Sequence, residues 1–312
     1  MRGEATVVKN AGSHYLLSRL PEWKLFPAVL RGKVRLAGSR ATNPVAVGDH
    51  VLYECEGEVS EESPASIVEI LPRSNHLIRK SVNLSKESHV IAANLDRVVV
   101  VASLYFPEIK LPFLDRILVT CGVYGIPVVL ALNKVDLYGE EAAEQVQEFR
   151  QIYEDAGYKV IETSVKDGRG IDELREECSR GTSLFSGESG VGKSSLIKAL
   201  DPTLQPKTGA ISVSHLQGKH TTSLSEMYPL SGGGFVIDTP GLRAFGLVNL
   251  EKEEIAKYFP EMLRLADSCR FAPCTHTHEP GCAVKQALER GELSELRYSS
   301  YLGMLEESGK FR

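Results

Sequence analysis

The chain has 312 residues, of which 42% are hydrophobic and 25% charged, a composition that predicts a globular protein of two or three domains. No apolar run approaches the ~20 residues of a membrane-spanning helix, and the N-terminus lacks the apolar stretch of a secretory signal, so we expect a cytoplasmic protein without a membrane partner. The net charge of −5 argues against non-specific nucleic-acid binding by the molecule as a whole.

Residues 1–75 contain short apolar runs separated by Gly, Pro and Asn about every 8–12 positions, which is typical of short antiparallel strands. Five such strands predict an OB-type β-barrel, a fold that often binds oligonucleotides. Residues 1–40 carry eight Lys and Arg against two Glu, a local balance of +6. This basic segment indicates either an RNA contact or a merely solvated face, and charge alone does not decide between them.

The rest of the chain divides into three parts. Residues 76–93 are mostly polar and without a clear hydrophobic period, and we interpret them as a linker. In residues 94–248 strands alternate with helices, which predicts a mostly parallel sheet built from βα units. Residues 249–312 indicate helices interrupted by a cluster of Cys and His. The predicted fold class is therefore multidomain α/β.

The first motif of the α/β region is Asn133-Lys134-Val135-Asp136, at the end of a buried strand. The carboxylate of Asp136 can accept the N1–H and N2–H₂ groups of guanine, whereas adenine would leave it unpaired, which disfavours an ATPase. Asn133 would pin the edge of the base and Lys134 would lie along the ring. One βα unit later, a backbone N–H at Ser164 or Val165 could read the guanine O6.

A phosphate-binding loop follows further along the chain, because residues 187–194 match G-x-x-x-x-G-K-[ST] at every position. The N–H groups of such a loop wrap the β-phosphate, and the following helix adds its positive dipole end. Lys193 would bridge the β- and γ-oxygens, and Ser194 would ligate Mg²⁺. The nucleotide contacts are therefore assigned to Gly187, Glu188, Ser189, Gly190, Val191, Gly192, Lys193, Ser194 and Ser195.

Two loops after the phosphate loop have the composition of switch elements. Asp238 ends a buried strand, where it can hold a Mg²⁺-bound water, and the N–H of Gly241 can reach the γ-phosphate. The polar segment 216–227 is rich in hydroxyl groups, as in loops that order when a Thr meets Mg²⁺ and the γ-phosphate. Thr221 and Thr222 both qualify as that Mg²⁺ ligand.

The Cys/His cluster has the spacing Cys269-x4-Cys274-x-His276-x5-Cys282. Thiolates and an imidazole at this spacing suit one closed tetrahedral Zn²⁺ site of structural type. By spacing alone, His278 could replace His276. The short helices around the cluster are expected to need the metal in order to pack, so chelation should unfold roughly residues 255–295 first.

The order of the nucleotide motifs is a cyclic rotation of the usual one, because the guanine motif precedes the phosphate loop. Such a rotation is tolerable because the termini of a domain usually lie close together at the surface. The new ends fall between the Asp238 loop and the Asn133 motif, which leaves the sheet unchanged. We therefore predict a circularly permuted P-loop GTPase domain in residues 94–248.

With these motifs the chain resembles the RsgA (YjeQ/YloQ) family of circularly permuted GTPases that depend on the small ribosomal subunit. The resemblance covers essentially the full length, and its matching stretches include "VGDHV", "AANLDRV", "NKVDL", "GESGVGKSSL", "KHTTS", "DTPGLRAF" and "CRFAPCTHTHEPGCAV". It implies an OB barrel, a permuted GTPase domain and a zinc module with His276 as the ligand. The sequence departs from the family's usual pattern at "LIRKS", where Arg-Pro is usual.

Leu242 follows the Asp238 loop where Ras-like enzymes carry a Gln that orients water. Intrinsic hydrolysis should therefore be slow, and the resemblance implies that ribosomal contact supplies or organises the missing group. His220, beside the Thr pair, is our candidate to position water, and a simple loop role or an RNA-facing role is its alternative.

Two functional hypotheses remain. The first is a monomeric enzyme that binds GTP or GDP with Mg²⁺, contacts the small ribosomal subunit and its rRNA, and couples hydrolysis to late maturation and its own release. The second is an RNA-binding assembly scaffold that binds nucleotide but turns little over. In either case, two binding domains flank one nucleotide switch, so nucleotide state could set their relative pose.

Overall fold

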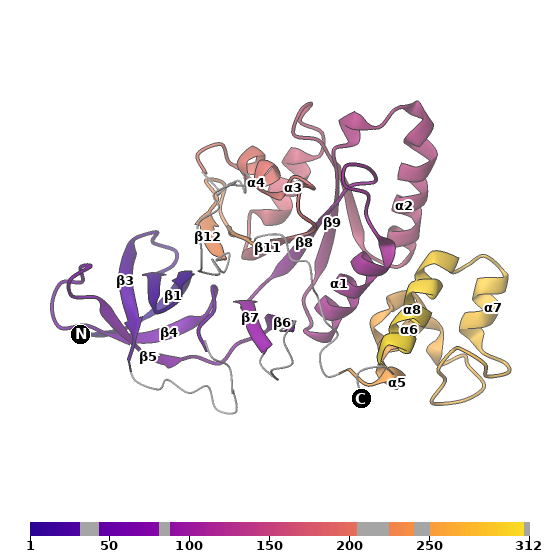
Figure 1. Ribbon diagram of the computed structural model, residues 1–312, viewed down its shortest axis with the longest axis horizontal. Coiled ribbons are helices and arrows are strands. Elements are labelled where there is room, and N and C mark those ends of the chain that lie inside the picture. Colours follow the sequence, from indigo (N-terminus) through magenta and orange to yellow (C-terminus); the bar gives the residue numbers. More distant parts are fainter. Residues whose placement is uncertain (32–43, 81–87, 205–224, 240–249, 309–312) are drawn as a thin grey trace, which may run out of the picture.

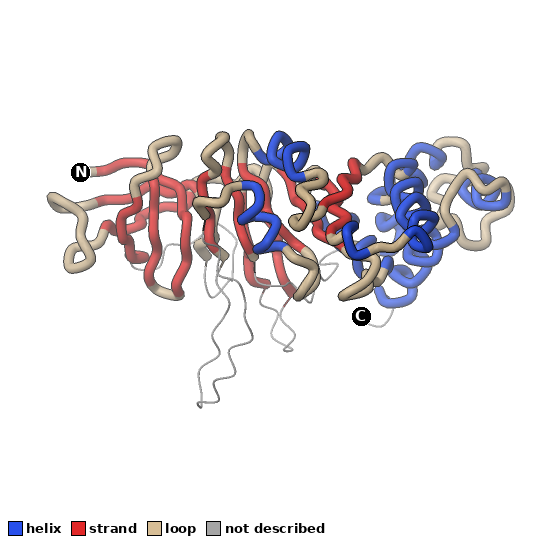
Figure 2. The backbone as a smooth tube through the Cα atoms, turned by 90° about the horizontal axis from the view of Figure 1, so that it is seen from above, coloured by secondary structure: helices blue, strands red, loops and turns tan. Residues whose placement is uncertain are grey.

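The structure is a computed structural model that describes residues 1–31, 44–80, 88–204, 225–239 and 250–308 (Figure 1). A barrel, a sheet flanked by helices and a bundle of helices follow one another along the long axis. The view turned by 90° shows the same row, with strands running from the barrel into the central sheet (Figure 2). No described helix is long and apolar enough to cross a membrane.

The N-terminal barrel consists of five strands, in agreement with the prediction. They are β1 (Arg2–Ala11), β2 (His14–Ser18), β3 (Leu25–Leu30), β4 (His50–Glu54) and β5 (Ala65–Ile70). They pair in the order β1-β2-β3-β5-β4, and β4 pairs with β1 to close the barrel. Alternate positions point inward, so that Val7, Leu17, Val51 and Ile67 are fully buried.

The predicted linker is not irregular chain, because it contains the paired strands β6 (His76–Lys80) and β7 (Ser88–Ala93). Asn75 closes this hairpin: its side chain donates to the carbonyl of Leu95 and accepts from the Leu95 N–H, both at 2.8 Å. Leu77 is fully buried within the core of the neighbouring domain. The pairing thus depends on tertiary contacts that a polar local sequence does not reveal.

The described part of the central domain has six strands and four α-helices, which alternate as predicted from β8 to α4. The strands are β8 (Arg97–Ala102), β9 (Val128–Asn133), β10 (Lys159–Thr163), β11 (Thr182–Ser186), β12 (Glu226–Pro229) and β13 (Phe235–Asp238). The helices are α1 (Leu111–Val123), α2 (Ala143–Asp155), α3 (Ile171–Cys178) and α4 (Lys193–Leu200), with the 3-10 turns η1 (Val135–Leu137) and η2 (Glu140–Ala142). The order β10-β9-β8-β11-β13 is parallel throughout, and β12 adds an antiparallel strand.

Both faces of this sheet are buried, which explains the continuous Val run of β8. Val98 and Val100 pack with residues of α1 and α2, whereas Val99 and Val101 pack with residues of α3 and α4. Strands covered on both faces read as unbroken hydrophobic runs rather than as alternating ones.

The barrel and the central sheet are continuous. β1 pairs antiparallel with β12, with Lys9 opposite Glu226, so that the two sheets form one eleven-stranded sheet. Val8 is buried in the core of the central domain, and Trp23 stacks on Phe235 with ring centroids 5.9 Å apart. The barrel is therefore docked on the central domain through backbone pairing and apolar contact.

The C-terminal part is helical, as predicted, and it packs on α1. Its elements are α5 (Lys252–Ile255), η3 (Ala256–Tyr258), α6 (Pro260–Ala266), α7 (Ala283–Glu289) and α8 (Glu295–Ser308). Val119 of α1 belongs to the same buried cluster as the apolar residues of these helices.

A buried ionic cluster around Arg297 joins this module to the central domain. The Arg297 guanidinium donates to Asp115 of α1 at 2.6 Å and to Glu261 of α6 at 2.7 Å. Tyr153 of α2 donates to the same Asp115 oxygen at 3.0 Å, and the guanidinium lies over the Phe259 ring. Burial opposes the charge on Arg297, but the two carboxylates outweigh it and raise its pKa, so the guanidinium stays charged.

Replacement of Arg297 by Met should destabilise the protein by about 3–5 kcal/mol, because it leaves two buried carboxylates without their cation. Denaturant unfolding followed by circular dichroism measures this loss. Arg290→Met is the matched control, since the Arg290–Glu292 pair is exposed and its loss should leave stability almost unchanged. Equal effects of the two substitutions would show that the buried cluster does not hold the module.

Candidate functional site

The carboxyl ends of β8, β9, β10, β11 and β13 meet at one edge of the parallel sheet. The guanine motif follows β9, the second base loop follows β10, the phosphate loop follows β11, and Asp238 ends β13. Ligands of open α/β sheets bind outside this edge. The structure therefore brings together the described parts of the predicted nucleotide site.

The phosphate loop, residues 187–192, needs its glycines. Gly187, Gly190 and Gly192 have φ values of 142°, 89° and 100°, which favour glycine. A Cβ at Gly187 would lie 2.3 Å from the Val101 carbonyl oxygen, and one at Gly192 would lie 2.5 Å from the Asn133 amide nitrogen. The loop is thus pressed against the neighbouring strand ends, with α4 beginning directly after it.

Lys193 lies within the curve of this loop. Its Nζ donates to the carbonyl oxygens of Gly187 at 2.8 Å and Glu188 at 2.7 Å, and the residue is only 7% exposed. Burial lowers the pKa of Lys193, although the carboxylates of Asp238 and Glu188 oppose that shift. A buried ammonium held by two carbonyls is placed where phosphate oxygens would be stronger partners.

Ser194 and Asp238 form the candidate Mg²⁺ site. The Ser194 hydroxyl donates to Asp238 Oδ2 at 3.3 Å. The other carboxylate oxygen, Oδ1, is buried and has no hydrogen-bond partner among the described residues. Burial raises the pKa of Asp238, opposed by Ser194 and Lys193 and assisted by the negative charge of Glu226. A hydroxyl beside an unpartnered buried carboxylate fits the oxygen ligands that Mg²⁺ requires.

The guanine motif is tied to the phosphate loop by side chains. Asn133 is 2% exposed, and its amide donates to the Val191 carbonyl at 2.8 Å while accepting from the Thr163 hydroxyl at 3.1 Å. Lys134 adopts φ 66°, and its Nζ donates to the Gly190 carbonyl at 2.7 Å. The amide of Asn133 thus joins two loops, and its contact with the base edge stays a prediction.

Asp136 and Ser164 come together at the base end of the site. The Ser164 hydroxyl donates to Asp136 at 2.7 Å, which aligns the carboxylate expected to accept from guanine. The Ser164 N–H donates to the Arg169 carbonyl at 3.0 Å, so it is already used. The Val165 N–H has no partner in the part of the chain that the structure describes, which favours Val165 among the two predicted donors to O6.

Sequence reasoning missed two supports of this site. The Tyr138 hydroxyl donates to the Asn133 carbonyl and accepts from the Leu104 N–H, both at 2.8 Å. It therefore holds the backbone of the guanine motif against the loop that follows β8. Lys134 also links the loop after β8 to the phosphate loop, because its Nζ donates to the Phe106 carbonyl at 2.5 Å as well as to the Gly190 carbonyl. Only the position of Tyr138, two residues after Asp136, could have indicated its role.

Several predicted residues lie outside the described residues, and the structure does not place them. They are His220, Thr221, Thr222, Gly241 and Leu242.

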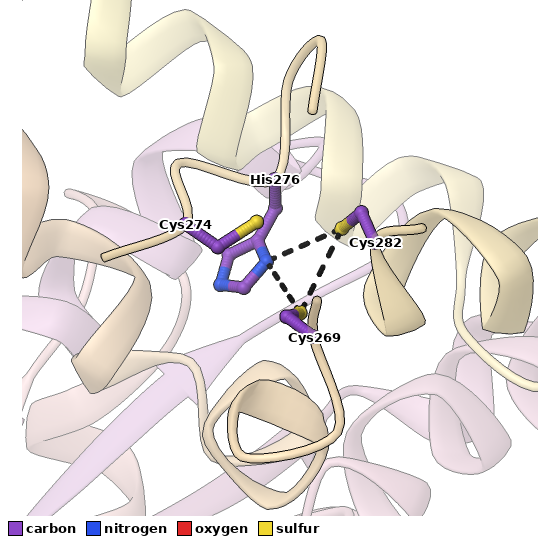
Figure 3. Close-up of side chains that lie close together, drawn as sticks. All are labelled: Cys269, Cys274, His276 and Cys282. Carbon is purple, nitrogen blue, oxygen red and sulfur yellow. Dashed lines mark hydrogen bonds between the residues drawn. The ribbon is translucent and has the colours of Figure 1, made fainter. Parts of the chain in front are cut away.

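The Cys/His cluster of the C-terminal module is assembled in space (Figure 3). One ligand atom from each of Cys269, Cys274, His276 and Cys282 lies within 4.8 Å of all the others. His276 Nδ1 is 3.4 Å from Cys282 Sγ and 3.6 Å from Cys269 Sγ. These separations are near the edges of a tetrahedron with Zn–S bonds of about 2.3 Å.

The chemistry of the donors also fits a metal. Burial lowers the pKa of His276, so its imidazole is neutral and able to ligate. Burial and the sulfurs of Cys282 and Cys269 raise the pKa of Cys274 to about 12, so thiolates here need a nearby cation. His278 is exposed and bonds to the Thr277 hydroxyl instead. The Tyr298 hydroxyl donates to the His276 carbonyl at 2.6 Å and fixes its backbone.

These loops define a class of protein, a P-loop GTPase in which the guanine motif precedes the phosphate loop along the chain. The family model for the RsgA GTPase matches residues 70–248. The chain belongs to the RsgA GTPase family, which confirms the predicted resemblance and the predicted GTP hydrolase activity.

Relatives match over nearly the full length. The small ribosomal subunit biogenesis GTPase RsgA of Bacteroides fragilis is 46% identical over 308 residues, covering 98% of each chain. That of Porphyromonas gingivalis is 45% identical over 312 residues, covering 99% of this chain and 98% of its own. Crystal structures of YjeQ from Thermotoga maritima and of YloQ, a circularly permuted GTPase, give TM-scores of 0.79 and 0.73. The YjeQ structure is 32% identical to this chain, and the match covers 100% of both chains. The YloQ structure is 27% identical, and the match covers 100% of this chain and 96% of the YloQ chain.

Asp136→Asn should lower GTP affinity by at least about 100-fold and narrow the preference for GTP over ATP, because an amide cannot accept both guanine donors. Competition binding with a fluorescent GTP analogue measures both quantities. Asp172→Asn serves as the control, since that side chain is 94% exposed on α3. An unchanged GTP preference in the Asp136 variant would remove Asp136 from the base site.

Metal removal should unfold the C-terminal module before the GTPase domain, because residues 267–282, which carry the four ligands, form no helix or strand of their own. Hydrogen exchange with and without a chelator should show loss of protection in roughly residues 255–295 alone. Cys269→Ser should lower the bound zinc measured by atomic emission, whereas Cys55→Ser, outside the cluster, should not. Protection that survives chelation would contradict a structural metal.

Proposed function

We propose that this chain is a GTPase of small ribosomal subunit biogenesis that binds GTP and GDP with Mg²⁺ at the carboxyl edge of its parallel sheet. One observation carries the proposal: Asn133 and Lys134 of the guanine motif bond directly to the phosphate loop at Val191 and Gly190. Base and phosphate recognition are thereby fixed relative to each other, as a guanine nucleotide requires. The printed names of the full-length relatives supply the ribosomal context.

The residues of the edge have separate tasks in this proposal. Asp136, aligned by Ser164, selects guanine, and the N–H groups of residues 187–192 with Lys193 hold the phosphates. Ser194 and Asp238 would hold Mg²⁺, which neutralises charge on the phosphates when bound. Thr221, Thr222 and Gly241 would complete the γ-phosphate contacts, and His220 would position water.

The flanking domains give the switch its partners. We assign RNA contact to the barrel, through its basic residues 1–40, and structural Zn²⁺ binding to Cys269, Cys274, His276 and Cys282. Each domain is attached to a different side of the GTPase domain, the barrel through β12 and the helical module through α1. The change between GTP and GDP would alter the pose of the two domains on the subunit and release a cytoplasmic monomer from it.

GTP turnover should rise by at least about tenfold when small ribosomal subunits are added, because an external contact completes the water-positioning site. Phosphate release measured with and without subunits tests this expectation. Lys193→Ala is the control that should abolish turnover in both conditions. No stimulation in the wild type would favour the scaffold over the switch.

The same assay examines His220. His220→Ala should remove the stimulated turnover while GTP affinity stays within about twofold of the wild type, because the imidazole is assigned to water and not to nucleotide. Unchanged stimulated turnover would exclude that role.

A further inference from the structure

β12 separates the barrel from the strand that carries the Mg²⁺-site aspartate. It pairs antiparallel with β13 on one side, with Glu226 opposite Asp238, and with β1 on the other, with Lys9 opposite Glu226. Residues directly opposite each other in antiparallel strands point to the same face of the sheet. Lys9, Glu226 and Asp238 therefore form one row across three strands, in which a cation is followed by two carboxylates.

Lys9 and Glu226 form a short ion pair within this row. Lys9 Nζ lies 2.8 Å from Glu226 Oε1, and the side chains of Lys9 and Glu226 are only 25% and 24% exposed. Side chains directly opposite on antiparallel strands have Cβ atoms about 5 Å apart, so the charge of Glu226 is close to Asp238. A half-buried position weakens solvent screening of these charges.

The position of Lys9 is fixed by the docking of the barrel. The neighbouring Val8 is buried against the GTPase core, and Trp23 stacks on Phe235 of β13. A second attachment pairs Val47 of the barrel with Ala92 of β7. The next residue, Gly48, donates its N–H to the Val7 carbonyl and so ties this attachment to β1. The ammonium of Lys9 is thus a fixed charge that one domain places beside the metal site of another.

We propose that Lys9 of the barrel is a positioning residue for the Mg²⁺ site of the GTPase domain, because it neutralises Glu226 next to Asp238. The inference rests on the proposed nucleotide function and specifies how the barrel takes part in it. Pairing with Lys9 offsets part of the negative charge that Glu226 adds to the metal site. By linkage, an occupied metal site must change the strength of the contact between β1 and β12.

Opposite substitutions should shift metal affinity in opposite directions. Lys9→Met leaves Glu226 unpaired and adds net negative charge near the site, so Mg²⁺ should bind about three- to tenfold more tightly. Glu226→Gln leaves Lys9 unpaired and should weaken Mg²⁺ binding by a similar factor. The double variant Lys9→Met with Glu226→Gln should return to within about twofold of the wild type, as should Lys9→Arg.

The experiment uses the full chain loaded with a fluorescent GDP analogue and titrates Mg²⁺ against the rate of nucleotide release. The half-effective Mg²⁺ concentration should fall in Lys9→Met and rise in Glu226→Gln. If the pair only held the barrel in place, both single variants would loosen it and shift this concentration in the same direction. Arg31→Met and Glu54→Gln, in an exposed pair of the barrel, should leave it unchanged.

Shifts of the same sign, or shifts below about twofold, would overturn the inference. Its failure is distinguishable from failure of the proposed function. A wild-type chain that retains GDP in a Mg²⁺-dependent manner, with variants that do not shift, rejects only the role of Lys9. A wild-type chain without Mg²⁺-dependent retention rejects the nucleotide site itself.

Discussion

Parallel pairing of β9, β8, β11 and β13 is the constraint on which the nucleotide site depends. Parallel strands deliver their carboxyl ends to one edge, whatever the order in which the chain visits them. The loop after β9 therefore meets the loop after β11, although 58 positions separate Asn133 from Val191. The permutation changes only which strand ends are joined, and hence which flanking domain each loop continues into.

The two flanking domains are attached to the GTPase domain by different kinds of interaction. The barrel joins through backbone pairing and apolar contacts, which tolerate small adjustments of register and tilt. The helical module joins through the buried cluster of Arg297, Asp115 and Glu261, whose charges need close geometry to offset desolvation. The nucleotide switch lies between these two attachments. On one side the barrel continues its sheet, and on the other side the helical module is held to α1.

Much of this architecture could be predicted from the sequence, because its motifs carry their own local geometry. The phosphate loop needs three glycines at fixed spacing, and the barrel strands are separated by turn residues. The hairpin of β6 and β7 was missed because its pairing rests on Asn75 and on burial against other domains. The role of the Asn133 amide was missed for a similar reason, since its partner Val191 is distant in sequence.

The junction of β1 and β12 was beyond local patterns altogether. Lys9 and Glu226 are 217 positions apart, and a four-residue strand carries too little periodicity to indicate its neighbours. Charge counts identified residues 1–40 as basic but could not show that Lys9 faces the GTPase domain rather than an RNA. Because Lys9 is paired with Glu226, it does not belong to the basic surface that composition alone had indicated.

The continuous sheet also bears on how this protein can be divided. Among the described strands, β12 has hydrogen-bonded neighbours on both sides, β13 and β1. A fragment that began after residue 75 would turn β12 into an edge strand with open N–H and C=O groups, and it would uncover Phe235 where Trp23 had stacked. Open edges of this kind recruit strands from other molecules. The barrel therefore also covers the β12 edge of the GTPase sheet.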